Sequence, residues 1–346
     1  MRYLAQAMMW LCLPGSLYAQ ALNTPSDFQS LIRVSEMNYQ PTAESWQGTP
    51  TQPLPVSTGV FVVKYKDDKQ LVKYTSVESN FVKKRKVKAA RYITEKDYEK
   101  AKQTLQQALK KMPQHADLMK VMAEIHKKDG ASVTALTWYK KAAETNPIDY
   151  QAYLKTAQIL TENGDYELAF KAVLYAKVLN RYSTDVQSEV KRIALLNGLN
   201  YRDWSFIPKF TLIKKGNNVQ IAYTGEPWRA YATSEAFWEH EPGYANTKSD
   251  TEEYDWDMIR YKESLLNGVV AYKLLKYADK KEEYPEIDAF SIAVSEGFID
   301  EYIQYEIIAL KRPHFIHTLE KPDIQRIVQY MLVTHFEKIP EKYAMK

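Results

Sequence analysis

The sequence predicts a mainly α-helical fold, in which an α-solenoid is followed by a helical C-terminal domain. The first observation is an internal period of 34 residues over about 82–183. The second is apolar residues at helical spacing in most segments after residue 225. The third is that the β-prone stretches are short and border turn residues, which predicts small hairpins. With 346 residues, 45% of them hydrophobic and 26% charged, the chain has the composition of a globular protein of about two domains.

The first residues have the layout of a signal peptide. The apolar run Leu4–Leu13 follows a basic residue, and small residues stand at positions −3 and −1 of a cleavage site after Ala21. Cleavage after Ala19 is the alternative. The run is about half the ~20 residues that a membrane-spanning helix needs. We therefore expect residues 1–21 to be a leader, and the mature chain to be periplasmic or secreted in a Gram-negative-type bacterium, without a transmembrane span.

The chain contains one cysteine, Cys12, and it lies inside the expected leader. The mature chain would then have no disulfide, no thiolate nucleophile and no cysteine-bound metal. Its stability would depend on a hydrophobic core alone.

Residues 22–80 form a mixed N-terminal arm. Four prolines fall within 40–57, a spacing typical of a linker or an extended segment. The β-prone stretches 59–65 and 70–75 flank a polar turn at 66–69, which predicts a hairpin.

The 34-residue period is carried by small residues. Two columns of alanine recur at that step, and we expect them to lie where helices touch: Ala101, Ala135 and Ala169, then Ala108, Ala142 and Ala176. Gly130 and Gly164 occupy the turn positions, with Lys96 at the equivalent place in the first copy. Helix backbones approach closely only where side chains are short, so the columns predict a stack of helical hairpins.

This pattern resembles the tetratricopeptide repeat (TPR) family. The resemblance implies three antiparallel helix pairs within 81–199, closed by a capping helix at about 184–199. It places the first helix of each pair on a concave face that usually binds peptides. The candidate binding residues on that face are Lys83, Lys86, Lys120, Lys127 and Lys155. Lys86 matches a lysine of the family's carboxylate clamp, but Ala90 and Val121 replace its asparagines, so the resemblance does not extend to that clamp.

One charge run stands at the start of the repeats. Residues 81–91 contain six cations and no anion. The run is either a site for an acidic partner, an anionic lipid headgroup or a polyanionic glycan, or a solvated helix face. The expected leader argues against nucleic acid as the partner.

Residues 200–346 have no repeat and form the expected C-terminal domain. Two β-prone stretches, 206–213 and 219–224, predict a hairpin in which Gly216 and Asn217 take positive φ. Helices are expected from Pro227 to about Glu239 and over 251–278, 285–310 and 321–338. The apolar stripe of the third is expected to be core.

An aromatic cluster surrounds Glu239-His240-Glu241 in this domain. Trp238 and His240 are candidate binding residues for a sugar ring or a peptide, and the alternative is that the aromatics are core. Adjacent residues on a helix point in different directions, so the triplet makes a poor metal site. His314 and His317 would bind zinc only with a further ligand. We expect no metal and no cofactor.

Motifs of several enzyme classes are absent from the sequence, including H-E-x-x-H, G-x-S-x-G and the phosphate-binding glycine loops. Paired carboxylates need no local motif, so a glycan- or peptide-acting enzyme with its site near Glu239 and Glu241 remains the alternative. The sequence favours a non-enzymatic TPR scaffold of the bacterial envelope that binds a protein or peptide, with an acidic partner among the possibilities.

Overall fold

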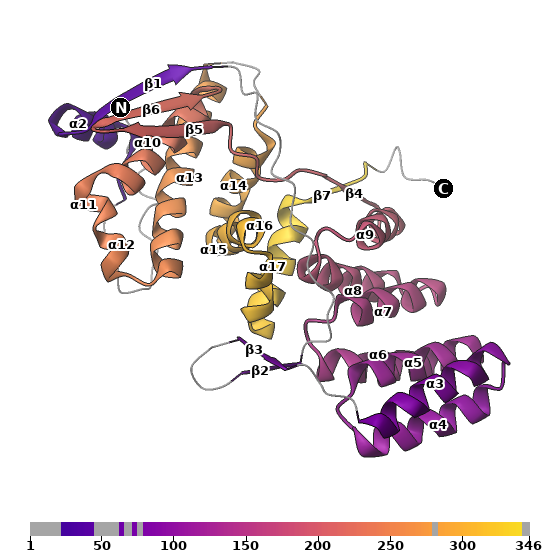
Figure 1. The fold of residues 1–346 in the computed structure, drawn as a ribbon. Coiled ribbons are helices and arrows are strands. Elements are labelled where there is room, and N and C mark those ends of the chain that lie inside the picture. The colour runs from indigo at the N-terminus through magenta and orange to yellow at the C-terminus, as the bar shows by residue number, and fades with distance from the viewer. Residues whose placement is uncertain (1–21, 45–61, 66–70, 75–78, 279–282, 341–346) are drawn as a thin grey trace. The chain divides into compact units, whose positions relative to one another are not determined.

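The computed structural model describes residues 22–44, 62–65, 71–74, 79–278 and 283–340 (Figure 1). The expected leader lies outside these residues, and so does most of the expected linker. The contacts divide the chain into two units. Unit 1 comprises Met1–Trp46 and Lys209–Lys281, and unit 2 comprises Gln47–Pro208 and Glu282–Lys346. The expected arm and the expected C-terminal domain are therefore each divided between the two units.

Seven helices of unit 2 form the repeat region. Their bounds are α3 (Asn80–Thr94), α4 (Tyr98–Lys111), α5 (Ala116–Lys128), α6 (Ser132–Thr145), α7 (Tyr150–Glu162), α8 (Tyr166–Leu179) and α9 (Thr184–Leu196). Helices α3 and α4, α5 and α6, and α7 and α8 pack in pairs, and α9 packs on α8 (Figure 1). The three pairs and the capping helix that the TPR resemblance implies are confirmed.

The small residues have the predicted role in packing. The six alanines of the two columns have no exposed surface: Ala101, Ala108, Ala135, Ala142, Ala169 and Ala176. Each also lies on the second helix of its pair. Short side chains here let the helices of a pair approach closely.

The turns within the pairs repeat one backbone conformation. Lys96, Gly130 and Gly164 have φ of 57°, 80° and 83°. Glycine adopts this left-handed conformation without strain, and Lys96 adopts it in the first pair. Gly198, with φ of 69°, continues the step after α9. The period therefore extends one turn beyond the three copies that the sequence indicated.

Replacing Ala135 or Ala169 with Leu is expected to lower the free energy of unfolding by about 1–3 kcal/mol, because the added atoms overpack a helix contact. Chemical denaturation measures the loss. The exposed residue Gln107 of α4 provides the control, since Gln107→Leu adds similar bulk where there is space. A melting temperature unchanged in both alanine variants would contradict the helix register.

The second part of unit 2 is formed by helices near the C-terminus. They are α14 (Pro285–Glu296), α15 (Ile299–Tyr302), the π-helix η2 (Ile303–Ile308), α16 (Ala309–Lys311), the 3-10 helix η3 (Pro313–Thr318) and α17 (Lys321–Thr334). The prediction of a single helix over 285–310 is wrong. Gly297 takes the left-handed conformation, with φ of 74°, and ends α14. The helix expected over 321–338 ends at Thr334, and β7 (Phe336–Lys338) follows.

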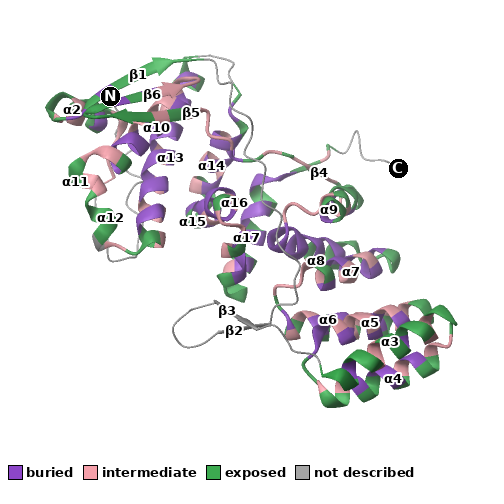
Figure 2. Cartoon of the chain, in the orientation of Figure 1, coloured by how far each residue is buried: buried purple, intermediate pink, exposed green. Residues whose placement is uncertain are grey.

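These helices pack on the end of the repeat region. Helix α17 contacts α8, which is buried along most of its length (Figure 2). Strand β4 (Leu199–Tyr201) pairs antiparallel with β7. A buried ion pair joins Arg181, after α8, to Glu306 of η2, with 2.7 Å between Nη2 and Oε2. The C-terminal helices are therefore joined to the last repeat by helix packing, a strand pair and a buried ion pair.

Unit 2 also contains the hairpin expected in the N-terminal arm. Strands β2 (Val62–Tyr65) and β3 (Leu71–Tyr74) pair antiparallel. The expected turn at 66–69 lies outside the described residues.

Unit 1 is a three-stranded sheet with helices. Its strands are β1 (Asn38–Ala43), β5 (Phe210–Lys215) and β6 (Asn218–Tyr223), in the order β1-β6-β5. Its helices are α2 (Pro25–Val34), α10 (Glu226–His240), α11 (Pro242–Ala245), α12 (Thr247–Asp250) and α13 (Glu253–Tyr277). Helix α10 packs on β5, β6 and α13 (Figure 1).

The N-terminal arm completes this unit. Strand β1 pairs parallel with β6, Asn38 opposite Asn218, so residues 38–43 are a strand and not part of a linker. The expected C-terminal hairpin is confirmed, with β5 and β6 antiparallel. Gly216 has the expected positive φ of 59°, but Asn217 does not. Glycine at the first of two turn residues is typical of a type II′ turn, which needs positive φ at that position only.

Candidate functional site

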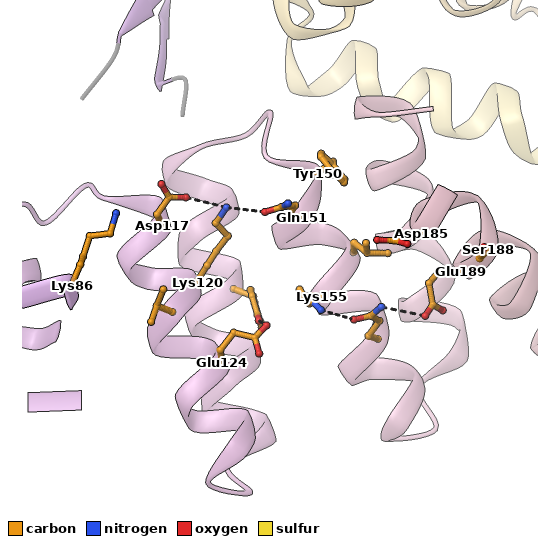
Figure 3. Close-up of a pocket in the computed structure, with 14 residues that line it drawn as sticks. Lys86, Asp117, Lys120, Glu124, Tyr150, Gln151, Lys155, Asp185, Ser188 and Glu189 are labelled. Carbon is orange, nitrogen blue, oxygen red and sulfur yellow. Dashed lines mark hydrogen bonds and ion pairs between the residues drawn. The ribbon is translucent and has the colours of Figure 1, made fainter. Parts of the chain in front are cut away.

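The concave side of the repeat helices forms an open groove of about 610 Å³ (Figure 3). It is lined mainly by the first helix of each pair and by α9. The lining residues are Lys86, Asp117, Lys120, Val121, Glu124, Tyr139, Tyr150, Gln151, Leu154, Lys155, Gln158, Asp185, Ser188 and Glu189. The concave face that the TPR resemblance implied is therefore a groove in this chain.

The groove is built from repeat-equivalent positions. Successive helices contribute residues that are 34 positions apart: Lys86, Lys120, Leu154 and Ser188; Asp117, Gln151 and Asp185; Val121, Lys155 and Glu189; Glu124 and Gln158. The same helix face thus lines the groove in each copy, while the chemistry changes from copy to copy. The period fixes where a side chain points, and the residue at that position determines what it can bind.

A lysine in the middle of the groove is held by two carboxylates. Lys120 Nζ lies 3.0 Å from Asp117 Oδ1 and 2.5 Å from Asp149 Oδ2. Burial acts to lower the pKa of Lys120, but the two aspartates outweigh it and the pKa is raised. Lys120 is therefore a fixed cation whose charge is already compensated within the protein.

Two further side chains of the groove are positioned by neighbours. Glu124 accepts a hydrogen bond from the Tyr139 hydroxyl, and burial together with this bond raises the pKa of Tyr139 well above its usual value. Lys155 Nζ donates to Gln158 Oε1 at 3.3 Å. These contacts hold the Glu124 and Lys155 side chains in place at the lining of the groove.

At the α9 end, Gln158 Nε2 donates to Glu189 Oε1 at 3.2 Å, and Glu189 also pairs with Arg192. Asp185 is exposed in the first turn of α9. Figure 3 shows Asp185, Ser188 and Glu189 at the opposite end of the groove from Lys86.

The five candidate lysines have different positions. Lys86, Lys120 and Lys155 line the groove, whereas Lys83 and Lys127 are not among its lining residues. Lys127 pairs with Glu162 at 2.8 Å. Lys83 is exposed on α3, about one turn before Lys86.

The sequence did not identify the α9 side of the groove, nor the aromatic residues Tyr139 and Tyr150. The signal for α9 was present, because Asp185, Ser188 and Glu189 continue the 34-residue step of the earlier copies. No local pattern distinguishes a groove tyrosine from a core tyrosine, so Tyr139 and Tyr150 needed the structure.

Trp238 and His240 lie in unit 1. The Trp238 side chain is buried, packs edge-to-face on Tyr244 and Trp256, and donates from Nε1 to Glu263 Oε2 at 2.6 Å. Trp238 therefore lies in the core, which is one of the two interpretations that its sequence context allows. His240 is half-buried, and burial lowers its pKa.

The carboxylates beside His240 have structural partners. Glu239 Oε1 lies 2.8 Å from Arg260 Nη1. Glu241 accepts hydrogen bonds from Ser35 Oγ at 2.6 Å and Tyr39 Oη at 2.8 Å, which join the N-terminal arm to α10. Within the described ranges, no three residues of the metal-binding types cluster as metal ligands would. No described helix has the length and hydropathy needed to cross a bilayer.

No protein-family model matches this chain, and no curated protein matches it. Several solved structures resemble it. The Yersinia enterocolitica type III secretion chaperone SycD, solved with a peptide of the translocator YopD, is 15% identical, with 36% of this chain and 99% of that chain covered and a TM-score of 0.32. Pseudomonas aeruginosa PilF is 15% identical over 72% of this chain and 96% of its own, with a TM-score of 0.31.

The TPR domain of P58(IPK) is also 15% identical, over 73% of this chain and 65% of that one, with a TM-score of 0.30.

The repeats of this chain are identified by its internal register, by the buried alanine columns and by the helix pairs that they build. Residues 80–196 form a TPR-like α-solenoid.

Proposed function

We propose that this chain is an exported, non-enzymatic scaffold whose TPR groove binds an extended peptide segment of a partner protein. The observation that carries the proposal is the groove itself, which is lined by repeat-equivalent positions of α3, α5, α7 and α9. The lining combines charged and polar side chains with Val121, Leu154 and two tyrosines. Stacked helical repeats use extended concave surfaces of this kind to bind their partners.

The test is a peptide selection on the mature full-length chain. A random library of 12-residue peptides is selected on the protein, and the affinities of enriched peptides are measured by fluorescence polarisation. Gln151 and Ser188 are exposed residues that line the groove. Replacing both with Trp fills the groove without entering the core, so the double variant is expected to lose binding.

Gln107→Trp on α4 is the matched control, because Gln107 is exposed and outside the groove lining. It should bind the selected peptides as well as the natural chain does. Peptides that bind the groove-filled variant and the control equally would contradict a peptide-binding groove.

Export is the second part of the proposal, and it rests on the layout of residues 1–21. The expected mature chain begins at Leu22, or at Gln20 if cleavage follows Ala19. The mass and N-terminal sequence of the protein recovered from the periplasm or culture medium of its native bacterium test export and cleavage directly. A full-length mass in the cytoplasmic fraction would contradict it.

The basic run on α3 is expected to strengthen binding to acidic partners. Lys83, Lys84, Val87 and Lys88 are exposed on this helix. Replacing Lys83, Lys84, Arg85 and Lys86 with Ser should weaken binding of an all-acidic 12-residue peptide and flatten its salt dependence. Exposed charges act over about 10 Å at 0.1 M salt, so binding to the natural chain should fall steeply as salt rises. Unchanged affinity and salt dependence would mean that the run is only a solvated face.

A further inference from the structure

We propose that the groove selects peptides by charge order, with acidic residues at the α3 end, apolar residues in the centre and basic residues at the α9 end. This inference rests on the proposed peptide-binding function and specifies its ligand. It comes from the distribution of charged side chains along the groove (Figure 3).

The α3 end of the groove is positive. Lys86 is the groove-lining residue that this helix contributes. Lys83 lies about one turn away, and the helix, from Asn80 to Thr94, contains no Asp or Glu. A carboxylate of a ligand that reaches this end therefore meets cations from a single helix.

The centre of the groove is balanced. It contains two cations, Lys120 and Lys155, and two anions, Asp117 and Glu124. Lys120 is paired with Asp117, and Glu124 accepts a hydrogen bond from a tyrosine. Because cations and anions are equal in number among these lining residues, the centre favours neither sign. An uncharged, apolar segment matches it best, since it leaves the existing pairs in place.

The α9 end is negative. Asp185 and Glu189 are the charged lining residues of this helix, and no lining residue of α9 is basic. Glu189 Oε2 is paired with Arg192 Nη2 at 2.6 Å, so Asp185 is the stronger of the two attractions for a basic ligand residue. Asp185 is exposed, and it can therefore pair with a ligand cation without the cost of desolvating a buried charge.

The two charged ends of the groove lie on the first and the last of the helices that line it, α3 and α9. An extended ligand that follows the groove would therefore have its opposite charges near its two ends.

The experiment uses four fluorescent 12-residue peptides of equal length, each with the same apolar centre. One has an acidic end and a basic end, one is acidic at both ends, one is basic at both ends, and one is uncharged. The natural chain is expected to bind the dipolar peptide about three- to ten-fold more tightly than each of the others, as two exposed ion pairs allow. The advantage should shrink at high salt.

Charge reversal in the protein should change the preference in a defined way. Lys86→Glu reverses the charge of the α3 residue that lines the groove, so the peptide with two basic ends should gain affinity relative to the dipolar peptide. Asp185→Lys makes both ends positive and should favour the peptide with two acidic ends. The double variant restores opposite ends in the reversed order, and the dipolar peptide should be preferred again because it can bind in the opposite direction. Lys110→Glu on α4, exposed and outside the groove lining, is the control and should leave the preference unchanged.

The outcomes separate the two proposals. Binding that the groove-filling Trp variant abolishes, but that does not depend on peptide charge order or on the reversals, would overturn the charge-order inference and leave the peptide-binding function standing. Binding that the groove-filled variant retains would overturn the peptide-binding function as well. The peptide preferences expected for the natural chain and for the charge-reversal variants would support both the peptide-binding function and the charge-order inference.

Discussion

Replacing Arg181 with Met is expected to lower the free energy of unfolding of unit 2 by about 3–5 kcal/mol, because it leaves the Glu306 carboxylate buried without its cation. Arg181 also donates from Nη1 to the Tyr305 carbonyl oxygen at 2.6 Å. Glu306 has no exposed surface, and its second oxygen accepts a hydrogen bond from Tyr330 at 3.1 Å. Denaturant unfolding followed by circular dichroism measures the loss.

Two further variants show whether burial is the cause. Arg181→Met combined with Glu306→Leu removes both charges and should cost less than Arg181→Met alone, since no uncompensated charge remains. Lys191→Ala breaks an ion pair with Asp203 in which both side chains are exposed. That change should cost less than about 1 kcal/mol. A loss in Arg181→Met as small as that in Lys191→Ala would show that the buried pair does not hold the C-terminal helices on the repeats.

Replacing Trp238 with Ala is expected to destabilise unit 1 by about 3–5 kcal/mol, because a buried indole leaves a cavity. The same change removes the hydrogen bond to Glu263, whose pKa is raised by burial. Trp238→Phe should cost less, since it keeps an aromatic ring in the same space. Equilibrium unfolding of the three proteins gives the ranking.

His240→Ala is the companion variant at the neighbouring residue, which is half-buried. It should change stability much less than Trp238→Ala. If Trp238→Ala left the fold intact and instead abolished binding of a glycan or peptide, the aromatic cluster would be a recognition site and its assignment to the core would be wrong.

The repeat region could be predicted from the sequence because its determinants are local and periodic. Ala135 and Ala169 define the helix contacts by their small size, and Gly130 and Gly164 mark turns that need positive φ. The groove follows from the same period, since equivalent positions on successive helices face the same side. The resemblance to the TPR family, applied in this register, places Lys120 and Lys155 on that face, and both line the groove.

The ion pairs within the groove could not be predicted in this way. Asp149, which holds Lys120 at 2.5 Å, belongs to the turn before α7, and its distance depends on how two repeats stack. The end of the groove at α9 is different, because Asp185, Ser188 and Glu189 continue the 34-residue step and could be placed from it.

The tertiary structure alone decided how the rest of the chain is divided. Strand β1 pairs with β6, although 180 residues separate Asn38 from Asn218, whose side chains are hydrogen-bonded. A strand takes its partner through backbone hydrogen bonds that any sequence can form, so the residues of 38–43 do not indicate which strand they join. Likewise, the apolar stripe of 285–310 predicted burial but not the surface on which it packs. Helices α14 and α15 pack on α17, and α17 in turn contacts α8. The sequence determined the repeats because small residues and glycines act over a few positions, and the fold determined the remainder because those contacts join segments far apart in the chain.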